Sequence, residues 1–146
     1  MEIIIMLRFA VALLALMTSA SAQELNPNGL TEKEYQECGE RWGAPGAIAE
    51  CLLQRDKAYG VQLEEAYKRA LDVTPDKALV HDAQRSWLNY QQATCKFHDV
   101  YARREGMGIA RALAARCLLL TTLQRLRELY PVLGCTWDEG RDRVKC

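Results

Sequence analysis

The chain has 146 residues, of which 19 are basic and 19 acidic, so its formal net charge is zero. Nucleic-acid-binding proteins attract phosphate with an excess of basic residues, and this balance excludes that class of partner. The length suits one domain. The sequence contains no GxSxG, HExxH or phosphate-loop motif, and its two histidines lie too far apart along one helix to share a site. We therefore expect neither an enzyme nor a bound cofactor.

Residues 1–22 have the features of a secretory signal peptide. Arg8 precedes the apolar run FAVALLALM, which is too short to span a bilayer, and an Ala-Ser-Ala cleavage motif follows. We expect cleavage before Gln23, a single helical domain over residues 23–146, and a periplasmic or secreted protein with no membrane span after cleavage. The initiator is either the first methionine or Met6.

The six cysteines all follow the expected cleavage site, and an even number in an exported chain indicates disulfide bonds. They are Cys38, Cys51, Cys95, Cys117, Cys135 and Cys146. Cys95 and His98 also form a CxxH half-site, but no second half-site accompanies it, so we expect no bound metal.

Apolar residues recur with helical spacing in three segments, at about 47–71, 76–102 and 109–130. The third segment carries leucines around its whole middle, which predicts that it is the most buried helix, and Pro131 is expected to stop it. Thr74 is expected to cap the second helix, with Pro75 at its first position. No segment alternates with a period of two, so no sheet is expected.

These elements predict an all-α fold, an up-down-up three-helix bundle stapled by disulfides. An irregular N-terminal segment, with at most a short helix over 31–39, would precede the bundle, and a short polar tail from Gly134 would follow it.

The second predicted helix carries two adjacent stripes that we expect to be buried against two neighbouring helices. One stripe is Leu79, Ala83, Trp87, Tyr90, Thr94, Phe97 and Tyr101, and the other is Val80, Gln84, Leu88, Gln91 and Cys95.

The up-down-up order predicts one disulfide from the rise along each helix. Cys95 lies about eight residues before the second turn and Cys117 about eight residues after it, so the two are level and should pair. Cys38 and Cys51 lie near one end of the bundle, and the last two cysteines near the other. Pairing in sequence order fits without long crossings, although their connectivity stays open.

Arg125 lies between leucines on one stripe of the third helix, and a buried arginine needs a partner. Counting the rise places it level with Gln84 and Trp87, and with Glu64 on the first helix. One interpretation is a recognition pocket that also includes Tyr90. The other, which we favour, is a structural cluster with the guanidinium bonded to Glu64 and packed on the indole. Asp56 and Glu64 could mimic an acid/base pair, but we interpret them as ion-pair partners.

Two motifs carry a resemblance to a known family, WLxYxxxxC on the second helix and CxxxxTxxRxxEL on the third. From Cys38 to Leu129 the chain resembles the LprI-type lysozyme-inhibitor family of small exported bacterial proteins. That family usually has Arg-Asp where this chain has Gln91-Gln92, and Asp and Asn near Gly60 and Glu64. The matching residues are Ala83, Gln84, Arg85, Trp87, Leu88, Tyr90 and Cys95, then Cys117, Thr122, Arg125, Glu128 and Leu129, with Cys51, Leu63 and Tyr67 upstream.

The resemblance implies a non-enzymatic inhibitor that occludes the cleft of a lysozyme and protects peptidoglycan. The lysozyme cleft holds two carboxylates, and candidate donors toward them are Arg103, Arg104 and Arg111 at the second turn. The alternative hypothesis is a structural or adaptor domain of the cell envelope that binds another protein or a wall fragment.

Overall fold

The computed structural model describes residues 29–138 and 143–146. These residues form four α-helices, a single 3-10 turn and two short strands. The expected signal peptide and its cleavage site lie outside the described residues. The elements are α2 (Gly29–Trp42), α3 (Pro45–Val73), α4 (Lys77–Ala102), η1 (Arg103–Glu105), α5 (Met107–Val132), β1 (Thr136–Asp138) and β2 (Arg143–Lys145).

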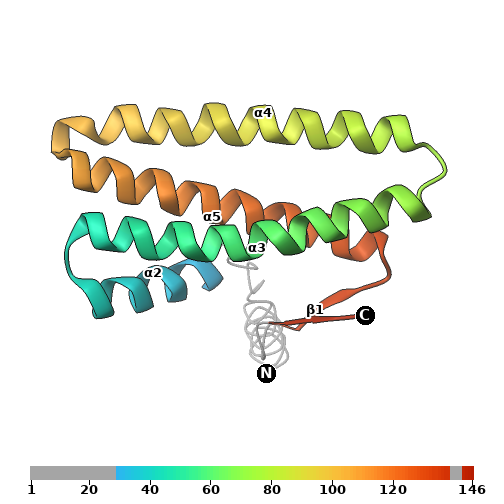
Figure 1. Ribbon diagram of the computed structural model, residues 1–146, viewed down its shortest axis with the longest axis horizontal. Helices are drawn as coiled ribbons and strands as arrows, with labels where there is room; N and C mark the ends of the chain where they lie inside the picture. The colour runs from blue at the N-terminus through green and yellow to red at the C-terminus, as the bar shows by residue number, and fades with distance from the viewer. Residues whose placement is uncertain (1–28, 139–142) are drawn as a thin grey trace, which may run out of the picture.

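The three long helices alternate in direction, and α5 is the central one (Figure 1). It lies beside α4 near η1 and passes behind α3 toward its own C-terminal end. Helix α5 packs against α2, α3 and α4, whereas α3 and α4 contact each other only over a short stretch. The prediction that α5 is the most buried helix is confirmed, because it supplies buried side chains along its whole length, from Ala110 to Tyr130.

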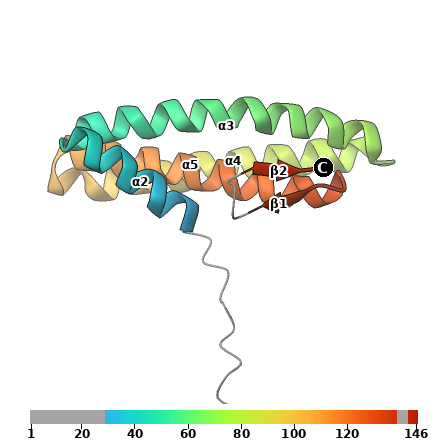
Figure 2. The ribbon, with the colours of Figure 1, turned by 90° about the horizontal axis from the view of Figure 1, so that it is seen from below.

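The description as a three-helix bundle is wrong, because α2 is a fourth helix that packs against α3 and α5 (Figure 2). The segment was expected to be irregular with at most a short helix over 31–39, and α2 includes that range but is longer. Cys38 on α2 is fully buried and bonded to Cys51. The nearly buried Glu34 carboxylate accepts a hydrogen bond of 2.9 Å from the Tyr59 hydroxyl and lies 3.5 Å from the Arg55 guanidinium. Burial raises the pKa of Glu34, and these two donors partly offset that rise.

Two helix ends differ from the sequence expectation for local reasons. The side chain of Asp76 caps α4 by accepting a hydrogen bond of 3.0 Å from the Leu79 amide, so the cap is Asp76 and not Thr74. Pro131 lies inside α5, which continues to Val132. Because Pro131 falls in the last turn, its missing N–H removes one hydrogen bond at the end of the helix and interrupts nothing further.

The C-terminal tail contains a small antiparallel ribbon that the sequence pattern did not predict. Strands β1 and β2 pair Thr136 with Lys145 and Asp138 with Arg143. Each strand has three residues, which is too short for an alternating pattern to be visible.

The core consists of two clusters along α5. The first joins α2, α3 and α5 around Cys38, Leu52 and Leu119, and the second joins α3 and α5 around Leu63 and Leu126. Helix α4 contributes little to either one, because Cys95 and Ala102 are its buried residues. This asymmetry leaves α4 as an outer helix.

The prediction that both stripes of α4 are buried is therefore wrong. The stripe that faces α5 is partly covered, but the exposed fractions of Leu79, Tyr90, Phe97 and Tyr101 are 64%, 54%, 63% and 54%. Helix α4 has one extensive neighbour, and a single neighbour covers a single stripe of a helix.

Candidate functional site

The six cysteines form three disulfides in sequence order. The predicted Cys95–Cys117 bridge is confirmed, and the structure settles the other two pairings, which the sequence had left open. Cys95–Cys117 ties α4 to α5, Cys38–Cys51 ties α2 to α3, and Cys135–Cys146 closes the terminal ribbon. The sulfur of Cys95 is thus committed to a disulfide and does not serve as a metal ligand with His98.

The proposed ion pair between Arg125 and Glu64 is absent from the described part of the chain. The Arg125 side chain, 11% exposed, donates to Glu128 one turn further along α5 at 2.9 Å and to Gln84 on α4 at 3.1 Å. Glu64 is 66% exposed and pairs with Lys68, one turn along α3. Glu64 therefore lies on the exposed surface of α3 and does not reach Arg125.

The recognition pocket suggested for the same residues is not assembled either. Gln84 bonds Arg125 as expected, and Trp87 packs partly buried against the second core cluster. Tyr90, however, lies on the exposed face of α4. Thr122 points elsewhere, since its hydroxyl donates to the Asp56 carboxylate at 2.7 Å. The structure thus divides the predicted set between a structural arginine, a buried polar network and an exposed aromatic face.

The three candidate arginines at the second turn are exposed and each has an acidic neighbour. Arg103 pairs with Asp99 at 2.6 Å, and Arg104 lies 3.3 Å from Glu105. Arg111 pairs with Glu50 of α3 at 2.9 Å. Exposed ion pairs of this kind contribute about 0–1 kcal/mol. A partner carboxylate can therefore replace the internal one at little cost.

An exposed aromatic face adjoins these arginines. It was not predicted from the sequence, because Tyr90, Phe97 and Tyr101 were expected to be buried. The Phe97 and Tyr101 rings stack with centroids 5.9 Å apart and an interplanar angle of 25°. The Arg104 guanidinium lies 4.3 Å from the centroid of the Tyr101 ring. We call Tyr90, Phe97, Val100 and Tyr101, together with Arg104 of the adjoining η1, the aromatic surface of α4.

The composition of this surface is typical of binding interfaces. Tyrosine and arginine are enriched among the residues that dominate binding energies, and contiguous exposed apolar patches often mark interaction sites. Because Phe97, Tyr101 and Arg104 stack on one another, their conformations are partly fixed before a partner arrives. Less side-chain entropy is then lost on binding.

Asp56 is a second feature that the sequence did not single out as a site, since we interpreted it as an ion-pair partner. Burial raises the pKa of Asp56, and the hydrogen bond from Thr122 partly offsets the rise. No Lys, Arg or His side chain within residues 29–138 or 143–146 forms a salt bridge with it. The ion-pair interpretation is thus wrong for Asp56, although it holds for Glu64.

Comparison with known proteins identifies a family. The model of one protein family, described as lysozyme inhibitor LprI, matches residues 38–129, which is more than half of the chain. The match runs from Cys38 on α2 to Leu129 near the end of α5, so it includes α3, α4 and most of α5. No curated protein and no solved structure matches the chain.

Proposed function

Because the chain belongs to the LprI family of lysozyme inhibitors, we propose that it binds a lysozyme through the aromatic surface of α4 and thereby blocks peptidoglycan hydrolysis. The family is one of inhibitors and not of enzymes. Inhibition then requires a surface that reaches the cleft of the hydrolase.

The observation that carries this proposal is the exposed stack of Phe97, Tyr101 and Arg104 at the C-terminal end of α4. Figure 1 places this end of α4 at the edge of the molecule, where it continues through η1 into α5. A projecting helical corner fits a concave partner better than a flat face does. The rings provide apolar contact area, and Arg104 provides a charged donor at the tip.

The charges of this corner suit the cleft of a lysozyme. That cleft uses two carboxylates in catalysis, and Arg103 and Arg104 are exposed by 54% and 62%. Arginine presents several donors in a planar fork that can bind a carboxylate with two hydrogen bonds. Each internal ion pair that must be broken is exposed, so the exchange costs little. Arg111 lies at the same end of the molecule and would contribute at the rim.

Export follows from the same proposal, because lysozymes act on the cell wall. We propose that residues 1–22 are removed and that the domain acts in the periplasm or outside the cell. Three disulfides support this location, since they form and persist in oxidising compartments. No helix in the described ranges is both long and apolar enough to cross a membrane.

The test measures how fast lysozyme lyses a peptidoglycan suspension, with turbidity as the readout. The rate without added protein is compared with the rates in the presence of the purified wild type and of Tyr101→Ala. We expect the wild type to slow lysis and Tyr101→Ala to lose at least about tenfold in potency, since it removes both the ring stacked on Phe97 and the support of Arg104. Arg104→Ala should weaken inhibition in the same direction.

Arg85→Ala is the matched control for Arg104→Ala, because Arg85 is also an exposed arginine with an acidic neighbour. It lies on α4, is 72% exposed and pairs with Asp82. This variant should inhibit like the wild type. Full inhibition by Tyr101→Ala would place the interface elsewhere. Unchanged lysis with the wild type would instead favour the structural or adaptor role in the envelope.

A further inference from the structure

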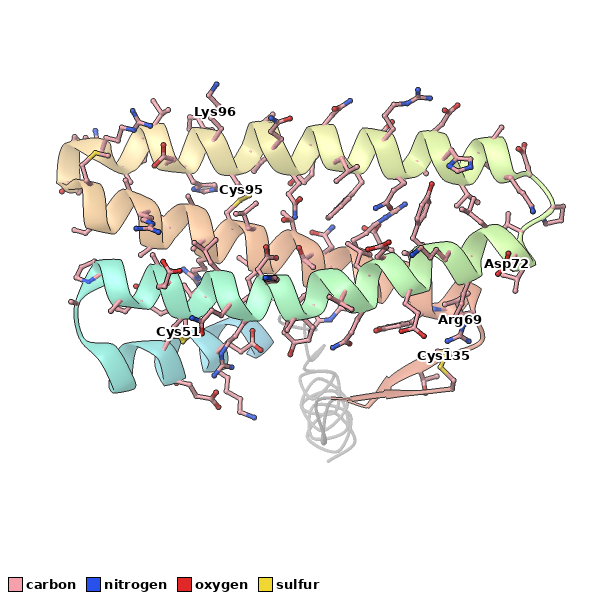
Figure 3. All side chains as sticks on the ribbon, in the orientation of Figure 1. Cys51, Arg69, Asp72, Cys95, Lys96 and Cys135 are labelled. Carbon is pink, nitrogen blue, oxygen red and sulfur yellow. A yellow bond between two sulfur atoms is a disulfide. The ribbon has the colours of Figure 1, made fainter. Side chains whose placement is uncertain are left out.

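A groove of about 550 Å³ lies between α3 and α4, on the side where α5 passes behind α3. Figure 3 shows side chains of both helices directed into this space. The walls include Leu63 and Tyr67 from α3 and Trp87 and Leu88 from α4, and Asp56 also lines it. The volume falls in the usual range for small-molecule sites, about 300–1,000 Å³.

A fixed polar network holds Asp56 in the groove. The Thr122 hydroxyl donates to Oδ1 of Asp56 at 2.7 Å, and the Gln91 amide donates to Thr122 at 3.1 Å and to Thr121 at 2.9 Å. The network thus links α3, α4 and α5. Oδ2 of Asp56 accepts no hydrogen bond from the residues that the structure describes. One oxygen is therefore anchored, and the other is available to a ligand.

The charged groups that share the groove leave the Asp56 carboxylate uncompensated. Glu64 pairs with Lys68, Arg85 pairs with Asp82, and His81 contacts the Tyr67 hydroxyl. Helix α5 contributes Thr122 and no charged side chain to the lining. A half-buried carboxylate without a counter-ion is unfavourable, and a cation that enters the groove relieves that cost.

We propose that this groove binds an alkylammonium or guanidinium group carried on a short apolar stem. The cation pairs with Oδ2 of Asp56, and the stem lies along Leu63 and Leu88. Trp87 and Tyr67 supply aromatic rings in the walls, and rings of this kind attract cations. The proposal does not depend on lysozyme binding, because the groove is distinct from the aromatic surface of α4.

The test uses n-butylammonium as the probe and 1-butanol as its uncharged counterpart, with the disulfide-bonded, nitrogen-15-labelled protein. Binding is followed by the indole N–H resonance of Trp87. We expect a saturable shift of the Trp87 resonance with butylammonium, and affinity at least about tenfold weaker for butanol. Equal affinity for the two probes would overturn the proposal.

Asp56→Asn is the decisive variant, because asparagine can still accept the Thr122 hydrogen bond but carries no charge. It should weaken butylammonium binding by at least about tenfold. Glu64→Gln is the matched control, since Glu64 lines the same groove but already has Lys68 as a partner, and it should change the affinity by less than about twofold. Unchanged binding by Asp56→Asn, or an equal loss in Glu64→Gln, would overturn the assignment.

Gly60→Leu tests the location without altering Asp56. A Cβ added at Gly60 meets no atom within 4 Å, so a larger side chain can enter the groove while α3 stays intact. Removing a helix-interior glycine also favours folding. We expect this variant to remain folded and to lose the Trp87 shift, and retained binding would contradict the proposed position of the ligand.

Discussion

At the scale of single residues, the ionised carboxylate of Asp56 should lower the stability of the folded protein at neutral pH. Its pKa is raised in the folded state, so the native protein holds this proton to higher pH than the unfolded chain does. The contribution of this group to stability is fully present below the ordinary pKa of aspartate and is lost as pH rises through its pKa in the folded state. Asparagine does not ionise, so Asp56→Asn avoids this loss of stability.

We therefore expect Asp56→Asn to raise the melting temperature at pH 7 and to have little effect below about pH 3, where both states are protonated. Glu64→Gln should behave oppositely. The hydrogen bond and charge of Lys68 lower the pKa of Glu64, so its contribution is present above its ordinary pKa and is lost as pH falls. Melting curves at several pH values check both signs, and a lower melting temperature of Asp56→Asn at pH 7 would contradict this account.

Arg125→Ala should destabilise the protein only moderately. Breaking a buried ion pair costs about 3–5 kcal/mol because an unpaired charge is left inside, but the carboxylate left behind here is Glu128, which is 45% exposed. The loss should be about 1–2 kcal/mol, from the Gln84 hydrogen bond and the packing of the side-chain stem. Urea unfolding measures it, and a loss above about 3 kcal/mol would indicate a buried partner after all.

The partner of Arg125 shows what residue-level prediction could and could not reach. The period of α5 and the cost of burying a charge correctly indicated a buried, bonded arginine. Rise along a helix gives the level of a residue, whereas the direction of its side chain depends on how each helix is rotated in the bundle. Glu64 was therefore chosen for its level, and the real partners, Gln84 and Glu128, are set by the rotation of α4 and α5.

At the scale of elements, the three long helices were predictable, whereas α2 was predicted only as a short helix at most and the terminal ribbon was not predicted. Strong apolar periodicity located α3, α4 and α5 to within two residues. Helix α2 depends on tertiary contacts, above all the Cys38–Cys51 bridge and the burial of Glu34 against Tyr59, and such contacts leave no local pattern. The position of α4 was misjudged because an amphipathic pattern does not distinguish a second buried stripe from an exposed apolar surface.

Helix α4 should depend on its disulfide more than any other long helix does. It buries Cys95 and Ala102, so few apolar contacts replace the bridge to α5 when it is removed. Replacing Cys95 and Cys117 by serine should cost roughly 2–5 kcal/mol. Hydrogen exchange should then show the α4 amides opening before those of α3 and α5.

The comparison variant has serine at Cys135 and Cys146, which removes the disulfide of the terminal ribbon and leaves the bridge to α4 intact. That variant should leave exchange in α4 unchanged. Equal opening of α3, α4 and α5 in the Cys95/Cys117 variant would show that the bundle unfolds as one unit without a weak helix.

At the scale of the whole molecule, the family resemblance and the Cys95–Cys117 bridge could be predicted from the sequence, whereas the binding surface could not. The arginines at the second turn were identified because charged side chains at a turn are expected to be exposed. The rings beside them were assigned to the core, since a sequence does not show how many neighbours a helix has. The outer position of α4 turns those apparent core residues into an interaction surface.

Hydrogen exchange of the protein with and without an excess of lysozyme tests the central claim most directly, because it locates the interface without altering any residue. We expect slower exchange from Phe97 through η1 to the start of α5 when lysozyme is bound. Exchange in α2 and in the ribbon of β1 and β2 should not change. Protection confined to α2 or the ribbon, with the α4–η1 corner unaffected, would contradict the account.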